Sequence, residues 1–159
     1  MSGPRKTAIV TGASQGIGAG IVKAFVERGF NVVDNSRTMT QSIEVAASDC
    51  VALVDGHIGE PATAAKIVEM ALSRFKSIDV LVNNAGIFFT KPFTDYTAED
   101  FRSLVTTNVE GFLYVTQLSI KQMLAQKTGG NIVTITAALA RNPVRGVTAT
   151  VPMITKGGL

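Results

Sequence analysis

A glycine-rich stretch near the N-terminus has the residue types and spacing needed to bind phosphate groups. Residues 7–10 form a short β-prone run, and Gly12, Gly16 and Gly18 follow before a helical pattern begins. A strand that turns into a helix through glycines offers free backbone N–H groups and the positive end of the helix dipole to an anion. Gly12 would permit a tight turn, Gly16 a close approach of a pyrophosphate, and Gly18 close packing of helix and strand. We therefore expect a phosphate-binding loop, in which Ser14 adds a hydroxyl donor; the alternative is a glycine turn without a ligand.

Five short apolar runs along the chain predict the strands that position this loop. They occupy residues 7–10, 31–33, 50–54, 79–82 and 131–135. Each run is continuously apolar instead of alternating, which is typical of strands buried on both faces of a parallel sheet. Helix-length segments separate the runs, so right-handed βαβ connections are expected. The predicted fold class is α/β, a doubly wound parallel sheet of the Rossmann type with three layers.

The segments between the strands predict helices with recognisable ends. The first covers about residues 16–28, and Gly29 stands at its C-terminal cap. A second begins near Pro61. The longest begins at Thr97, with Asp100 completing an acidic variant of the capping box, and continues to just before Gly129. The apolar faces are expected at Ile17, Ile21, Ala24 and Phe25 in the first helix and at Ile67, Ala71 and Phe75 in the second.

Composition excludes several classes of protein. Of 159 residues, 46% are hydrophobic, too many for a disordered chain, and a single cysteine excludes an internal disulfide framework. No stretch approaches the ~18 apolar residues of a membrane span. The net charge of +3 comes from scattered basic residues, which does not favour nucleic-acid binding. We expect a cytoplasmic protein without a membrane, nucleic-acid or metal partner.

Four motifs together make the sequence resemble the short-chain dehydrogenase/reductase family. They are Thr11-Gly12-x-x-x-Gly16-x-Gly18, Asn83-Asn84-Ala85-Gly86, Thr107-Asn108-Val109 and Lys156-Gly157-Gly158. The resemblance implies that residues 1–159 form a single NAD(P)-binding domain. It also implies hydride transfer between a nicotinamide and a small carbonyl or alcohol substrate. Because such a sheet normally carries more cover beyond a fifth strand, we expect this chain to be the retained part of a longer polypeptide, truncated after that strand.

The residues after the second and third strands should select the cofactor. The position where the family carries a ribose-binding acid falls on Ser36, and Arg37 follows, so the resemblance favours NADP. Asp34 leaves NAD possible, because it lies about 20 residues after the glycine loop. His57 occupies the position of an adenine-contacting acid, unless it is a surface histidine. The predicted cofactor-binding set is Gly12, Ser14, Gln15, Gly16, Ile17, Gly18, Ser36, Arg37, His57, Asn83, Ala85, Gly86 and Lys156.

The proton-transfer residues of the family are only partly matched. Lys156 and Asn108 stand at the family's lysine and asparagine positions, whereas Pro152 replaces the tyrosine and Ala137 the serine. The predicted catalytic residues are therefore Asn108, Lys156 and the neighbouring hydroxyl of Thr136. Two hypotheses remain open. The chain is either an oxidoreductase with an altered proton donor or a catalytically silent NADP-binding sensor or partner subunit.

The family also implies an oligomer. Its members pair the long helix and the lysine-bearing helix across a twofold axis. The long helix of this chain carries Phe112, Leu113, Val115, Leu118 and Ile120, more apolar surface than one sheet-facing stripe needs. We therefore expect a homodimer or homotetramer.

Overall fold

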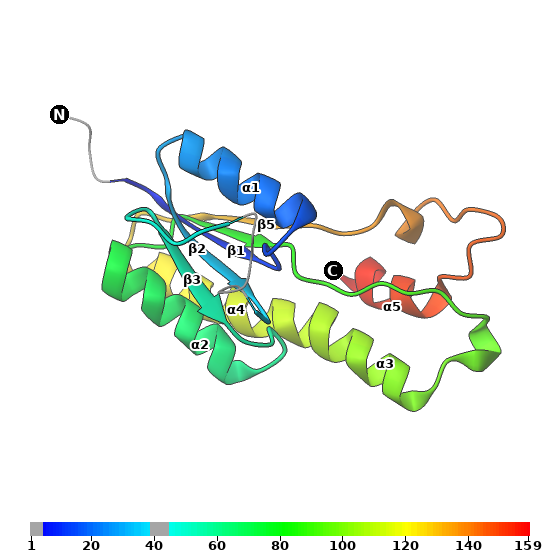
Figure 1. The fold of residues 1–159 in the computed structure, drawn as a ribbon. Coiled ribbons are helices and arrows are strands. Elements are labelled where there is room, and N and C mark those ends of the chain that lie inside the picture. The colour runs from blue at the N-terminus through cyan, green and yellow to red at the C-terminus, as the bar shows by residue number, and fades with distance from the viewer. Residues whose placement is uncertain (1–4, 39–44) are drawn as a thin grey trace.

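The computed structural model describes residues 5–38 and 45–159. Five strands alternate with helices in the order expected from the apolar runs (Figure 1). The strands are β1 (Thr7–Thr11), β2 (Asn31–Ser36), β3 (Val51–Asp55), β4 (Val80–Asn83) and β5 (Asn131–Thr134). The helices are α1 (Gly16–Glu27), α2 (Pro61–Met70), α3 (Ala98–Val105), α4 (Gly111–Ala125) and α5 (Thr150–Gly158).

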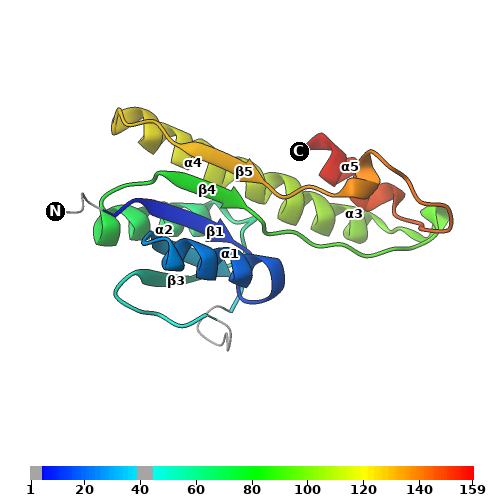
Figure 2. The same ribbon diagram turned by 90° about the horizontal axis from the view of Figure 1, so that it is seen from above.

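The strands form one parallel sheet in the order β3-β2-β1-β4-β5. Ile9 in the central strand lies opposite Val33 of β2 and Leu81 of β4. Helix α1 covers one face of the sheet, and α2 and α4 cover the other, as the two views in Figures 1 and 2 show. The doubly wound parallel α/β architecture is therefore confirmed. All four pairs of neighbouring strands are parallel, so the carboxyl ends of all five strands lie at the same edge of the sheet.

Each face of the sheet has its own apolar core. On the α1 face, Val10 and Val32 pack with Val22 of the helix. On the other face, Ile9 packs with Ile67 of α2, as do the further core residues Val33, Leu81, Val115 and Met123. A π-helical turn at Ala71–Phe75 continues α2. Burial of Ile67 and Ala71, with Phe75 packed against them, confirms the face predicted for the second helix.

The apolar face predicted for the first helix is only partly correct. Ile21 and Phe25 pack against the core, but Ile17 is 68% exposed. Gly18 and Val22, one turn apart, face the sheet instead. Ile17 therefore points to the side of the helix away from β1.

Two further expectations need correction. The fifth strand is not buried on both faces: Ile132 and Val133 are exposed, whereas β3, which forms the opposite edge of the sheet, is mostly buried. The long helix does begin at the Thr97–Asp100 capping box, and it ends at Ala125, before Gly129. It is interrupted, however, by a π-helical turn at Thr106–Glu110 between α3 and α4.

In the part of the chain that the structure describes, no helix is long and apolar enough to cross a membrane.

Candidate active site

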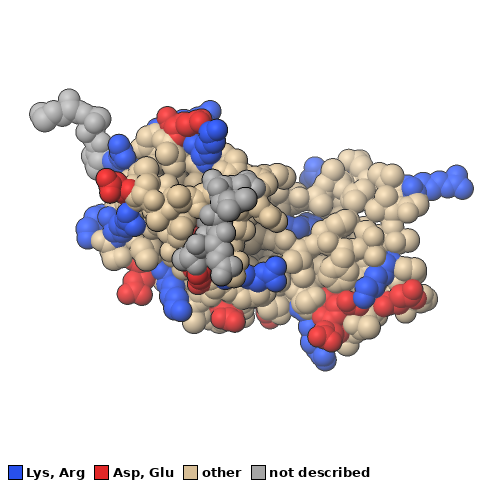
Figure 3. Space-filling view, in the orientation of Figure 1, with Lys and Arg blue, Asp and Glu red and all other residues tan. Residues whose placement is uncertain are grey.

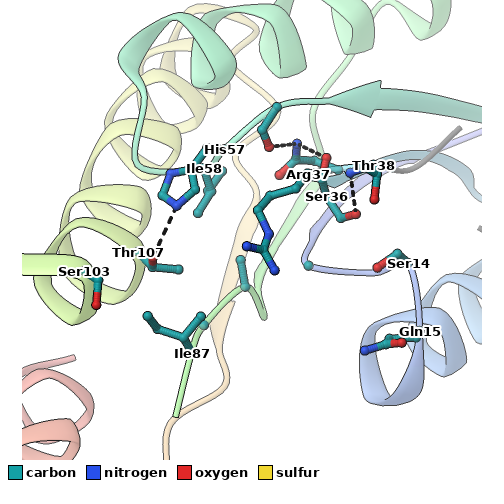
Figure 4. Close-up of a pocket in the computed structure, with 15 residues that line it drawn as sticks. Ser14, Gln15, Ser36, Arg37, Thr38, His57, Ile58, Ile87, Ser103 and Thr107 are labelled. Atoms are coloured by element: carbon teal, nitrogen blue, oxygen red, sulfur yellow. Dashed lines mark hydrogen bonds between the residues drawn. The ribbon is translucent and has the colours of Figure 1, made fainter. Parts of the chain in front are cut away.

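A cleft of about 350 Å³ opens at the carboxyl ends of β1 to β4. Open α/β sheets bind ligands at this edge, beside the point where the strand order reverses, which here lies between β1 and β4. Figure 4 shows Arg37 extending into the space between Ser14 and Gln15 on one side and His57 and Thr107 on the other. Predicted cofactor-binding residues that line the cleft are Gly12, Ser14, Gln15, Ser36, Arg37, His57, Ala85 and Gly86.

The glycine loop has the backbone conformation that its sequence demands. Gly12 and Gly16 adopt φ angles of +67° and +60°, which side chains disfavour. A Cβ at Gly12 would come 2.6 Å from the Cα of Ala85, so the loop and the turn after β4 are in direct contact. Nothing lies within 4 Å of a Cβ at Gly16, which leaves its backbone open for a ligand. Gly18 packs inward, since a Cβ there would come 2.5 Å from the carbonyl oxygen of Gly12.

Two residues outside the predicted set fix this loop in place. The Asn84 Nδ2 donates to the carbonyl oxygens of Thr11 (2.9 Å) and Gly12 (2.8 Å). In return, the Thr11 Oγ1 accepts from the backbone N–H groups of Asn84 (3.2 Å) and Ala85 (3.0 Å). These bonds join the ends of β1 and β4, the neighbouring strands at the reversal point. The signal in the sequence was a polar residue at the end of each of two strands, Thr11 as the last residue of β1 and Asn84 directly after β4.

Some predicted cofactor-binding residues do not line the cleft. Asn83 is buried, and its Nδ2 donates to the Thr116 Oγ1 of α4 at 3.0 Å. Gly16, Ile17 and Gly18 lie beyond the lining residues, at the start of α1. Gly18 allows α1 to pack closely against the glycine loop, and Asn83 links β4 to α4 through its hydrogen bond.

A cationic side chain, and no acidic one, follows the end of β2 at the cleft. Arg37 forms no hydrogen bond or ion pair with the residues that the structure describes, and Ser36 lies beside it. Among the described residues that line the cleft there is no Asp or Glu. The wall around Arg37 is therefore suited to an anionic group.

Asp34 cannot serve as the ribose-binding acid, because it points into the sheet. It is fully buried, opposite Val10 of β1 and Leu53 of β3. Neither carboxylate oxygen has a hydrogen-bond partner of good geometry among the described residues. Burial raises the pKa of Asp34 to about 7, against a smaller opposing effect of the Asn35 backbone N–H.

His57 lies at the far side of the cleft from the glycine loop. Its Nδ1 accepts from the backbone N–H of Gly59 at 3.1 Å, and its Nε2 lies 3.4 Å from the Thr107 Oγ1. Thr107 belongs to the π-helical turn between α3 and α4 (Figure 4). The ring is therefore held between the loop after β3 and that turn.

Asn108, in the same turn, uses its whole side-chain amide within the protein. Its Oδ1 accepts from the Ile87 backbone N–H at 2.9 Å, and its Nδ2 donates to the Ile87 carbonyl at 3.1 Å. The Nδ2 also donates to the Thr155 Oγ1 at 2.9 Å. Asn108 thereby joins the segment after β4 to the helix that carries Lys156.

Lys156 lies immediately behind the cleft. A Cβ at Gly86, which lines the cleft, would come 2.6 Å from its Nζ. The Nζ donates to the Ile135 carbonyl at 3.3 Å, and burial lowers the pKa of this ammonium below its ordinary value. A lysine with a lowered pKa transfers a proton more readily near neutral pH.

The other positions considered for proton transfer are Thr136, Ala137, Pro152 and the tyrosine Tyr96, and they lie in different surroundings. Thr136 and Ala137 line a second hollow together with Lys156, and Thr136 is exposed. Pro152 is buried in α5 and its carbonyl accepts from the Thr155 hydroxyl. Tyr96, one of two tyrosines in the chain, donates to the Phe89 carbonyl in the loop before α3. Lys156 is thus a proton-carrying side chain placed against the cleft, which His57 also lines.

The surface charge shows no single concentrated basic patch on the face in Figure 3, where Lys and Arg side chains stand in separate groups with acidic ones between them. Among the residues that the structure describes, no group of three His, Cys, Asp or Glu side chains is placed to hold a metal ion.

Residues 6–149 match the family model described as short chain dehydrogenase. The chain belongs to the short-chain dehydrogenase family. An uncharacterized oxidoreductase of Methylorubrum extorquens is 34% identical over 97% of this chain. A sorbitol dehydrogenase of Cereibacter sphaeroides is 31% identical over 86% of it. The chain spans 62% and 54% of the length of these two family members, respectively.

Solved structures of other short-chain dehydrogenases superimpose closely. One is the 3-ketoacyl-(acyl-carrier-protein) reductase from Brucella melitensis, complexed with NADH, with a TM-score of 0.90 and 30% sequence identity. The superposition covers 98% of this chain and 66% of the reductase chain. The aldohexose dehydrogenase of Thermoplasma acidophilum has a TM-score of 0.85 and 26% identity, covering 98% and 57%. These likenesses establish the Rossmann-type fold and an oxidoreductase family.

Proposed function

We propose that this chain is an NADP-linked oxidoreductase that interconverts a small carbonyl compound and its alcohol. The observation that carries this proposal is the glycine loop, whose backbone is open at Gly16, together with the Lys156 Nζ that lies behind Gly86 in the wall of the cleft. This loop fits a pyrophosphate, because the backbone around Gly16 is open where a side chain would stand. The bound dinucleotide would supply or accept the hydride.

Arg37 supports the preference for NADP over NAD. Its guanidinium enters the cleft, and no carboxylate of the described lining opposes it. A guanidinium binds a phosphate with two parallel hydrogen bonds, whereas an acid at Ser36 would repel that phosphate and bind a ribose hydroxyl. Since Asp34 is buried in the sheet, it offers NAD no compensating contact.

Lys156 supplies the proton in this proposal. Addition of hydride to a carbonyl carbon leaves an alkoxide, and the Lys156 ammonium protonates that oxygen; in the reverse direction the amine removes the proton. Burial lowers the pKa of Lys156, which brings the donor closer to the working pH. Asn108 keeps α5 against the segment after β4 through Thr155, and the exposed hydroxyl of Thr136 is available to a substrate oxygen.

The test joins cofactor binding to turnover. Calorimetry should show NADP binding more tightly than NAD, and Arg37→Met should remove that difference without weakening NAD. Turnover with a panel of small ketones and alcohols should be lost in Lys156→Met while NADP still binds. If no dinucleotide binds the unmodified chain, the proposal is wrong; if NADP binds without turnover of any substrate, the chain is the silent NADP-binding subunit instead.

We also propose that the chain forms a homodimer or homotetramer through α4, in the cytoplasm. Leu113, Ile120 and Leu124 are exposed on this helix, seven and four residues apart. That spacing places them on one face, which supports a helix-to-helix contact between two copies. Light scattering should give a dimer or larger species, and Ile120→Lys should shift it toward monomer; a monomer in the unmodified chain would contradict the proposal.

A further inference from the structure

Lys156 lies between two hollows, and the proposed function assigns a ligand only to the first of them. On one side its Nζ approaches Gly86 in the wall of the cleft. On the other side Lys156 lines a second hollow of about 510 Å³, together with residues that follow β5 and with the end of α5. That volume suits a small molecule. Since a substrate has to reach the proton-carrying lysine without displacing the cofactor, the second hollow is the place for it.

The segment after β5 is held against α5, so the second hollow has fixed walls. A Cβ at Gly157 would come 3.8 Å from the Cβ of Ala140, and the two elements lie side by side in Figure 2. Ala140 ends a 3₁₀ turn at Ala138–Ala140, whose first carbonyl accepts from the Arg141 backbone N–H at 3.1 Å. The backbone of Arg141 is therefore fixed beside the helix that carries Lys156.

The second hollow offers positive charge and no opposing carboxylate side chain. Arg141 and Lys156 line it from two different elements, and Thr136 and Asn142 add a hydroxyl and an amide. Among the described residues that line it there is no Asp or Glu. The Arg141 side chain is exposed and forms no hydrogen bond or ion pair with the part of the chain that the structure describes. A guanidinium in this state can bind a carboxylate or a phosphate through two parallel hydrogen bonds.

We propose that the second hollow binds the substrate and that Arg141 makes the enzyme selective for carbonyl compounds that carry a separate anionic group, a carboxylate or a phosphate. The inference rests on the proposed oxidoreductase function and names its substrate class. With the anionic group paired to Arg141, the carbonyl oxygen lies toward Lys156, which protonates it when hydride reaches the carbon. An oxo acid thus becomes a hydroxy acid, and its anionic group is unchanged. A neutral compound of the same shape gains nothing from the guanidinium.

Pairs of compounds that differ chiefly in charge test this selectivity. Steady-state kinetics with NADPH should give a kcat/KM for 4-oxopentanoate at least about tenfold above that for the neutral 4-oxopentanamide. Dihydroxyacetone phosphate and dihydroxyacetone form the second pair, and the larger of the two ratios tells whether the hollow takes a carboxylate or a phosphate. Arg141→Met should bring that ratio down toward one. Arg141→Lys, which keeps the charge but loses the two-pronged geometry, should keep part of it.

Arg145→Met is the matched control. Arg145 is exposed on the same connection between β5 and α5 but does not line the second hollow. Its substitution should leave the ratio in place, whereas an effect equal to that of Arg141→Met would show a general influence of surface charge and overturn the inference. Equal rates for the charged and neutral members of both pairs would also overturn it, with the proposed function intact.

A binding measurement separates this inference from the proposed function. Pentanoate has the carboxylate but no carbonyl to reduce, so its binding needs neither cofactor nor turnover. Calorimetry without dinucleotide should show pentanoate binding to the unmodified chain, and binding at least about tenfold weaker to Arg141→Met. Such binding without turnover of any carbonyl compound would refute the proposed function and leave the anion site standing. Equal binding to the two proteins would overturn the anion site itself.

Discussion

The Lys156 ammonium group occupies the space that a side chain at Gly86 would need. A Cβ at Gly86 would come 2.6 Å from the Nζ and 3.2 Å from the Cε of Lys156. Because the far end of a lysine moves easily, Gly86→Ala should displace the Nζ, and the loss of stability should be small, limited to the close contact of the new Cβ with the Asn108 Oδ1 at 3.1 Å. Turnover should fall by about 100-fold, the order expected for a misplaced catalytic group. Steady-state kinetics and thermal unfolding of the same sample would measure both effects.

Gly20→Ala is the matched control for that substitution. Gly20 lies in α1, and nothing lies within 4 Å of a Cβ placed there. Alanine should stabilise the helix by roughly 0.5–1 kcal/mol and leave turnover unchanged. Full activity in Gly86→Ala would show that the position of the Lys156 Nζ does not matter for the reaction.

Ser36→Asp should reverse the cofactor preference. The carboxylate would stand beside Arg37, neutralise part of its charge and repel a 2′-phosphate at close range. We expect the ratio of the dissociation constants for NADP and NAD to rise by about tenfold or more, measured by calorimetry. Ser36→Ala, which removes the hydroxyl alone, should change that ratio by less than the aspartate does; equal effects would mean that charge plays no part.

The order of strands and helices could be predicted from the sequence because each element carries its own periodicity. The exposure of β5 could not, since Ile132 and Val133 are of the same residue types as the buried strands, including β3 at the opposite edge. The π-helical turn at Thr106–Glu110 lies in close contact with the loop after β3: a Cβ at Gly59 would touch Thr106, and one at Gly111 would touch Ile58. Such contacts leave no local pattern.

The glycine loop was predictable from spacing, but the bonds that hold it were not. Thr11 and Asn84 meet only because β1 and β4 are neighbours in the sheet. Asp34, by contrast, could have been placed correctly from the sequence. It lies two residues after Val32, which is buried, and alternate residues of a strand share a face.

Asp34 should make stability fall as pH rises through the neutral range. Its pKa is about 7 in the folded chain and near 3.8 when unfolded, so the folded state binds the proton more tightly. Its destabilising effect is absent below about pH 4, develops between pH 4 and 7, and is complete above that. A shift of three units corresponds to about 4 kcal/mol as an upper limit. Urea unfolding of Asp34→Val should therefore show a gain in stability that is larger at pH 8 than at pH 5.

Asp49→Asn provides a control for that pH dependence, since Asp49 is an exposed aspartate just before β3. Its substitution should leave the difference between pH 5 and pH 8 nearly unchanged. A gain from Asp34→Val that is equal at both pH values would mean that the carboxyl group keeps an ordinary pKa in the folded chain.

Asn108→Ala should destabilise the chain by more than a typical single hydrogen bond. The substitution leaves the Ile87 N–H and carbonyl without their partner and removes one bond from the Thr155 hydroxyl, which keeps its bond to the Pro152 carbonyl, in a site where Asn108 is 1% exposed. Each unsatisfied buried group costs about 1–3 kcal/mol, so a loss of at least about 2 kcal/mol in the free energy of unfolding is expected. Thr155→Val, which keeps the shape and removes one of the three bonds made by Asn108, should cost about half as much. Urea unfolding of both variants measures these losses. A loss below about 0.5 kcal/mol in Asn108→Ala would show that this amide does not hold α5 against the segment after β4. In that case, a loss of turnover in the same variant would have to come from direct contact of Asn108 with the reacting groups.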